Sequence, residues 1–138
     1  HFFDENRRVL EQVQALKNGD FEGFLAGVRA SGRSSWMLLQ NIIPLGSTAH
    51  QQMALAQALC EKLLDGRGAC RVHGGGFAGT ILAFVPDEML GQFRSGAEAV
   101  LGAGSCHVLS IRQTGGTRLA NAYAKAERAV TDREKILQ

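Results

Sequence analysis

The sequence lacks the features that mark membrane-spanning, secreted and nucleic-acid-binding chains. No apolar run approaches the length of about 18 residues that a membrane span needs, and the N-terminus has no signal-peptide pattern. Fifteen basic and thirteen acidic residues are interspersed and leave a net charge of +2, so no basic patch for nucleic acid or anionic lipid is present. The three cysteines form no C-x-x-C pair, which favours reduced thiols over a disulfide framework. These absences predict a cytoplasmic protein with neither a membrane nor a nucleic acid as partner.

What is present is typical of a globular domain with a single core. The 138 residues are 45% hydrophobic and 20% charged. The chain has no initiator methionine, and His1 falls inside a helical pattern. We therefore expect the sequence to be a fragment of a longer protein.

Helical periodicity dominates the first half of the chain. Apolar residues recur at helical spacing over residues 5–17 and 21–39, and again between Thr48 and Leu64. Asp20 is a typical N-cap for the second of these helices. The residues expected to face the core are Phe21, Phe24, Leu25 and Val28 in the second helix, and Met53, Ala56, Leu59, Cys60, Leu63 and Leu64 in the third.

The second half has the texture of short strands alternating with helices. Residues 69–73 and 80–85 are β-compatible, residues 87–101 are helical, and residues 107–112 alternate weakly as a third strand. An alanine-rich helix is expected after Gly116. This order of elements predicts the α+β class, in which helices cover a small antiparallel or mixed sheet.

A glycine-rich loop lies between the first two expected strands. Gly74, Gly76 and Gly79 match G-x-G-x-x-G, but the apolar run that follows has the character of a strand, whereas a dinucleotide fingerprint needs a helix there. A Walker A loop is excluded because no Lys-Ser or Lys-Thr follows the glycines. The spacing alone leaves two readings open, a plain turn without a ligand and a loop whose backbone approaches another segment or an anion.

The residues around this loop carry a resemblance to a known family. The stretch Gly68–Pro86, GACRVHGGGFAGTILAFVP, resembles the third conserved motif of the GHMP small-molecule kinases, and within them the galactokinase form G-A-R-M-T-G-G-G-F-G-G-C-T. Upstream, His1, the pattern Glu5-Asn6-x-Arg8-Val9 and the segment Ala15–Phe24 are also similar to galactokinases. The resemblance covers about residues 1–112, which leaves residues 113–138 as a C-terminal turn and helical extension.

The resemblance implies a ferredoxin-like GHMP kinase C-terminal domain. In the intact enzyme, ATP and Mg would serve transfer of the γ-phosphoryl group to the anomeric hydroxyl of galactose. The catalytic residues would lie in a missing N-terminal kinase domain, so none is assigned to this chain and the isolated domain is expected to be inactive. The residues that would lie beside the nucleotide phosphates are Gly74, Gly75, Gly76, Phe77 and Gly79.

Two departures from the galactokinase pattern concern the substrate and the loop. Galactokinases usually have Ser-His near position 32 and a D-x-Y-x-V-S-like segment after it, where this chain has Ser31-Gly32 and residues 39–44 read LQNIIP, and this leaves the sugar open. The chain also has Ala78 where glycine is usual, which makes the loop less permissive at that position. One alternative is a GHMP kinase for another small alcohol or sugar. Another is a free-standing ferredoxin-like module that binds a small ligand, with the glycine loop as an anion-binding nest.

Two further candidate sites carry less weight. Cys70, His73, Cys106 and His107 are possible zinc ligands, but the usual two-pair spacing is missing and no metal site is predicted. The segment Ser31–Ser35 faintly resembles a phosphate loop, but it falls within a helical pattern.

Overall fold

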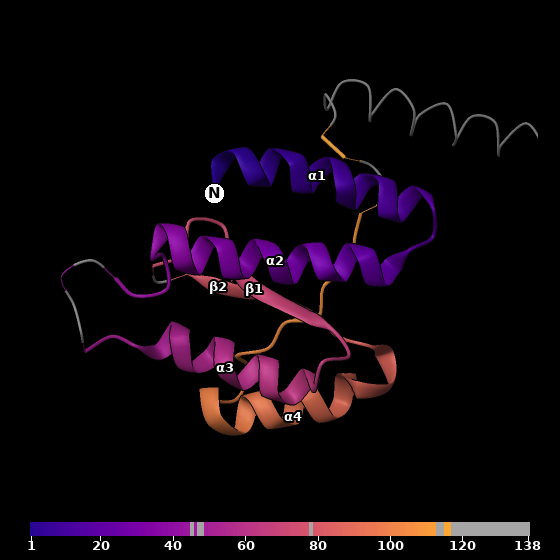
Figure 1. Ribbon diagram of the computed structural model, residues 1–138. Helices are drawn as coiled ribbons and strands as arrows, with labels where there is room; N and C mark the ends of the chain where they lie inside the picture. Colours follow the sequence, from indigo (N-terminus) through magenta and orange to yellow (C-terminus); the bar gives the residue numbers. More distant parts are fainter. Residues whose placement is uncertain (45, 47–48, 78, 113–114, 117–138) are drawn as a thin grey trace, which may run out of the picture. The chain divides into compact units, whose positions relative to one another are not determined.

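The computed structural model describes residues 1–44, 46, 49–77, 79–112 and 115–116 (Figure 1). The described residues contain four α-helices, one short 3-10 helix and a two-stranded antiparallel sheet, which confirms the predicted α+β class. Residues 1–107 form one compact unit that holds all of these elements. The remainder is a separate unit, in which the described residues form neither helix nor strand. No helix in the described ranges is long and apolar enough to cross a membrane.

The first two helices form an antiparallel pair, α1 (Phe2–Lys17) and α2 (Phe21–Leu39). The Asp20 carboxylate caps α2 as predicted, because its Oδ1 accepts a hydrogen bond of 2.8 Å from the backbone N–H of Gly23. Of the expected core face, Leu25 and Val28 are buried, whereas Phe21 is exposed. Phe21 is the first residue of α2, and its ring stacks on that of Phe24.

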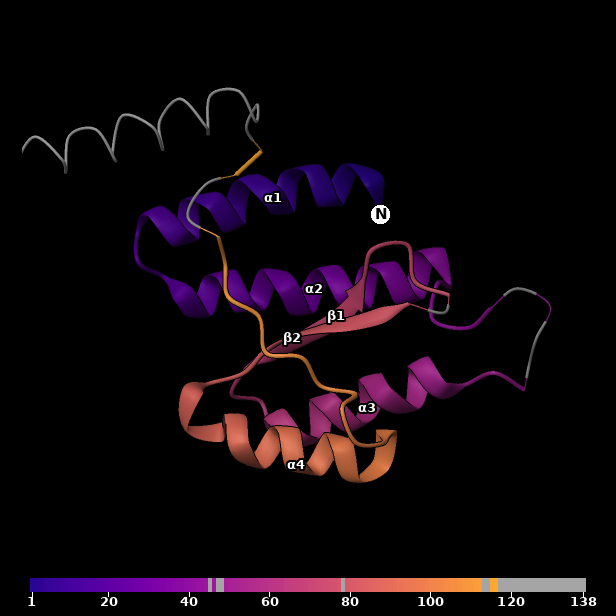
Figure 2. The same cartoon turned by 180° about the vertical axis from the view of Figure 1, so that it is seen from behind.

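The sheet consists of β1 (Ala69–His73) and β2 (Thr80–Phe84), with Ala69 opposite Phe84 and His73 opposite Thr80. Helix α2 packs on one face of this hairpin, and the opposite face is covered by α3 (Gln52–Leu64) and α4 (Leu90–Leu101) (Figures 1 and 2). The short 3-10 helix η1 (Asp87–Met89) joins β2 to α4.

Alternate strand residues enter two separate clusters, as the period of two in a strand requires. On the α2 side, Ala69 and Phe84 pack with Leu25 and Val28. On the α3–α4 side, the cluster contains Cys60, Leu64, Cys70 and Phe93, with Leu63, Ile81, Ala83 and Val85 around it. The hairpin is therefore sandwiched between helices, and this arrangement fixes the position of the loop that joins its two strands.

Three sequence expectations have other outcomes. The strand predicted at residues 107–112 is wrong, because these residues pair with no strand in the described part of the chain and their weak alternation does not create a strand without a partner. The helix expected after Gly116 lies outside the described residues, as does Thr48. Gln57 is buried in α3, although its polar side chain was not expected in the core.

Candidate functional site

The glycine loop, residues 74–79, follows β1 and turns the chain through conformations that favour glycine. Gly74 and Gly76 have φ values of +65° and +84°. Phe77 also has a positive φ, of +64°, which costs an L-residue about 1–2 kcal/mol. Backbone strain of this kind persists only where surrounding contacts hold it, and it is concentrated at functional sites.

Those contacts come from the segment that follows α2. The chain turns at Gln40, whose φ is +54°, and this places Asn41 against the glycine loop. The backbone N–H of Phe77 donates a hydrogen bond of 2.6 Å to the carbonyl oxygen of Asn41. A Cβ on Gly76 would lie 2.2 Å from the same oxygen, so only glycine allows this approach. The glycine at 76 therefore serves packing within this chain.

Asn41 is the residue at this site that sequence reasoning missed. It is 2% exposed, and its side-chain Oδ1 has no hydrogen-bond partner in the described residues. A buried polar atom left without a partner costs about 1–3 kcal/mol, so its retention beside the loop needs a reason. Asn41 is polar and was not expected in the core, whereas the apolar Ile42 that follows it is buried to the same degree.

The outer side of the loop is open. Gly74 and Gly75 are exposed, and a Cβ on either would meet no atom within 4 Å. Gly79 lies at the neck of the loop, where a Cβ would be 3.5 Å from the Gly76 carbonyl oxygen. Phe77 is half-exposed, and Ala78 lies outside the described residues. The structure thus places the five predicted site residues on one loop, with the backbone of Gly74 and Gly75 uncovered.

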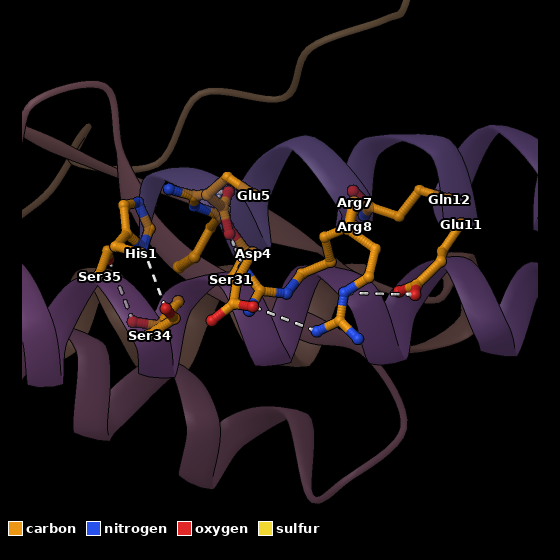
Figure 3. A network of polar contacts seen from close by, with 12 residues as sticks. His1, Asp4, Glu5, Arg7, Arg8, Glu11, Gln12, Ser31, Ser34 and Ser35 are labelled. Carbon is orange, nitrogen blue, oxygen red and sulfur yellow. Dashed lines mark hydrogen bonds and ion pairs between the residues drawn. The ribbon is translucent and has the colours of Figure 1, made fainter.

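A cluster of polar side chains from α1, α2 and β1 stabilises the strand that leads into this loop (Figure 3). Ser31 Oγ donates a hydrogen bond of 2.6 Å to Glu5 Oε2, and Arg71 Nη1 donates to Ser31 Oγ. Arg8 forms an ion pair with Glu5, and Arg71 Nη1 lies 3.7 Å from Glu5 Oε2. Burial, and next the positive charge of Arg8, lower the pKa of Arg71. The cluster ties α1, α2 and β1 together through charge-assisted hydrogen bonds.

The cluster also gives a physical reason for one departure from the galactokinase pattern. A Cβ on Gly32 would lie 2.9 Å from the Cβ of Arg71 and 3.5 Å from its Cα. Helix α2 can therefore lie directly on β1 only because position 32 has no side chain. A histidine there would separate Arg71 from Ser31.

The serine segment from 31 to 35 is not a phosphate loop, because it is part of α2 and its hydroxyls are engaged. Ser34 Oγ lies 3.0 Å from His1 Nδ1, and Ser35 Oγ donates to the Gly32 carbonyl oxygen at 3.1 Å. Figure 3 shows His1 and Ser34 on the facing sides of α1 and α2. These serines support the helix pair.

The cysteines do not form a metal centre within the described ranges, where no group of three potential ligand side chains occurs. Burial raises the pKa of the Cys60 thiol to about 11 and that of Cys70 to about 12. Gln57 Nε2 donates to Cys70 Sγ at 3.2 Å. Both thiols are therefore protonated at neutral pH.

Comparison with known proteins finds galactokinases among the matches. The chain is 33% identical over 97 residues to the galactokinase of Actinobacillus pleuropneumoniae, and 31% identical over 94 residues to that of Haemophilus influenzae. Each match covers 68% of this chain and 23% of the relative. The chain thus spans about a quarter of the length of the curated relatives it matches. No family model matches the sequence, and no solved structure matches it significantly.

Proposed function

Because these matches identify the chain as galactokinase-like, we propose that residues 1–112 are the C-terminal domain of a GHMP-type sugar kinase. The intact protein transfers the γ-phosphoryl group of ATP to the anomeric hydroxyl of galactose in the cytoplasm. Residues 113–138 are a C-terminal extension of this domain. The catalytic residues lie in an N-terminal domain of the same protein.

The observation that carries this proposal is the uncovered backbone of the glycine loop. Gly76 and Phe77 are anchored on Asn41, and this fixes the loop while Gly74 and Gly75 face outward with open space around them. A loop that is rigid at one side and free of side chains at the other can bring backbone amides close to a phosphoryl group. Phosphoryl transfer depends mainly on such positioning and on electrostatic stabilisation.

The residues present fit the phosphate part of a nucleotide and do not fit its metal. Gly74, Gly75, Gly76 and Gly79 offer backbone N–H groups, which are hydrogen-bond donors for phosphate oxygens, whereas the N–H of Phe77 already donates to Asn41 and Phe77 contributes its position beside them. Mg²⁺ prefers carboxylate and phosphate oxygens, and the described part of the loop has no acidic side chain. The residues that hold Mg²⁺ therefore belong to the rest of the protein.

The proposal is tested with the longer protein that contains this chain. Purified protein is incubated with ATP, Mg²⁺ and a panel of sugars and small alcohols, and ADP release is followed together with the identity of the phosphorylated product. We expect galactose 1-phosphate as the main product, and no turnover by residues 1–138 alone. A different preferred acceptor would replace galactose but keep the kinase assignment. Phosphorylation by residues 1–138 alone would refute the placement of the catalytic residues.

A further inference from the structure

A small pocket lies beside the first residues of β1, whereas the glycine loop follows the last residue of this strand. The pocket has a volume of about 300 Å³, and Figure 1 shows the two helices that form it, α2 and α3, on either side of β1. Its lining includes Arg29, Arg33 and Trp36 of α2, Glu61 and Leu64 of α3, and Cys70 of β1. This volume is at the lower end of the range for ligand pockets, so it suits a small molecule.

Hydrogen bonds fix both walls of the pocket to β1. On the α2 side, Arg29 Nη1 donates to the carbonyl oxygen of Gly68 at 2.8 Å. On the α3 side, the buried Gln57 donates through Nε2 to Glu61 Oε1 at 3.0 Å and to the Cys70 carbonyl oxygen at 3.3 Å. The walls are thus held in place before a ligand arrives, which lowers the entropic cost of binding.

The pocket contains one positive and one negative charge that do not neutralise each other. Arg29 is paired with Glu22, but Arg33 makes no hydrogen bond or ion pair within the described residues. Glu61 accepts the hydrogen bond from the neutral Gln57 amide and forms no ion pair in the same part of the chain. Arg33 and Glu61 line the pocket from different helices. A ligand that used both charges would carry a negative group and a positive group.

The remaining lining is apolar and includes an aromatic ring. Trp36 is 39% exposed and lines the pocket together with the buried Leu64 and Cys70. Aromatic rings pair favourably with one another in offset-stacked or edge-to-face arrangements. The third feature of the ligand is therefore an apolar group, for which an aromatic ring is the best partner.

We propose that this pocket binds a free α-amino acid with an aromatic side chain. Its carboxylate pairs with Arg33, whose planar guanidinium matches a carboxylate through two parallel hydrogen bonds. Its ammonium group pairs with Glu61, and its ring packs on Trp36. The inference goes beyond the proposed function and does not rest on it, because the pocket shares no residue with the glycine loop.

The fluorescence of Trp36 tests the proposal directly, because this residue is the single tryptophan of the chain. Residues 1–138 are titrated with L-phenylalanine, and we expect a saturable change with a Kd of about 1 mM or lower. Two analogues each lack one charge: 3-phenylpropionate has no ammonium group, and 2-phenylethylamine has no carboxylate. We expect both to bind at least about tenfold more weakly. Equal binding of either analogue, or no saturable change up to about 10 mM L-phenylalanine, would overturn the proposal.

Substitutions of the two charged residues assign the binding to this pocket. Arg33→Gln and Glu61→Gln should each raise the Kd for L-phenylalanine at least about tenfold. Arg94→Gln is the matched control, because Arg94 is an exposed arginine of α4 outside the pocket, and its Kd should be unchanged. The urea midpoint of each variant separates lost binding from lost fold, and the two analogues test the same charges in the native chain. Native affinity in folded Arg33→Gln or Glu61→Gln would refute the assignment.

Calorimetric titration of the longer protein with L-phenylalanine shows whether the pocket is accessible there. We expect a Kd within about threefold of that for residues 1–138. Binding by residues 1–138 without binding by the longer protein would mean that the rest of the protein covers the pocket. This result would overturn its assignment as a ligand site.

Discussion

Replacing Gly76 with alanine tests whether the glycine loop is held by Asn41. The substituted residue would keep a φ near +84°, which costs an L-residue about 1–2 kcal/mol. Its Cβ would lie 2.2 Å from the Asn41 carbonyl oxygen, which belongs to the backbone and cannot rotate away. The loop must then move and lose the Phe77–Asn41 hydrogen bond, which contributes about 0.5–1.5 kcal/mol. We expect the free energy of unfolding to fall by about 1.5–3.5 kcal/mol.

Equilibrium urea denaturation of residues 1–138 measures this change, with Gly75→Ala as the matched control. Gly75 is the adjacent glycine, it has open space around its Cα, and its φ is not in the left-handed region. We expect Gly75→Ala to change the free energy of unfolding by less than about 0.5 kcal/mol. Equal effects of the two substitutions, or a loss below about 0.5 kcal/mol for Gly76→Ala, would refute the argument that contact with Asn41 requires glycine at 76.

Two further substitutions and one pH titration test the glycine loop and the packing of the domain around it. Gly75→Val in the longer protein should lower kcat at least about tenfold and leave the urea midpoint unchanged within error. The added side chain would crowd the bound phosphate, but it would contact no atom of this domain. A comparable loss of stability would instead favour a structural turn without a ligand. Gly32→His should lower the free energy of unfolding by about 1–3 kcal/mol, since its Cβ overlaps Arg71, and an unchanged urea midpoint would contradict the close packing of α2 on β1. The raised pKa values of the Cys60 and Cys70 thiols contribute stability that is complete below pH 9 and is lost as the pH rises toward 11 and 12. The urea midpoint should therefore fall over this pH range in the native protein, and it should fall less in a Cys60→Ala, Cys70→Ala variant. The same dependence of the midpoint on pH in both proteins would rule out the two thiols as its cause.

Helices α2 and α3 and both strands were predictable because their signals are local. The apolar spacing of Leu25 and Val28, the Asp20 cap and the β-compatible run from residue 80 depend only on neighbours in sequence. The strand at residues 107–112 was wrong for the complementary reason. A strand exists only through pairing with another, and no such partner was available in the described residues.

The candidate site was predicted only in part. The sequence showed that residues 74–79 need unusual backbone freedom, but not which contact requires it. Asn41 is 2% exposed and accepts the hydrogen bond from Phe77, but a polar side chain after the end of a helix is not by itself a signal of burial. The reason for Gly32 also appeared only when α2 was placed on Arg71.

The sequence by itself determined the α+β class, the hairpin with its glycine loop and the resemblance to galactokinases, because periodicity, caps and a dense motif are written in consecutive residues. The tertiary structure decided that Gly76 contacts Asn41, that Gly75 has open space around it, and that Gly32 packs against Arg71. Such contacts join residues far apart in the chain. They depend on how closely two packed backbone segments approach each other, and the pattern of neighbouring residues in the sequence does not reveal that distance.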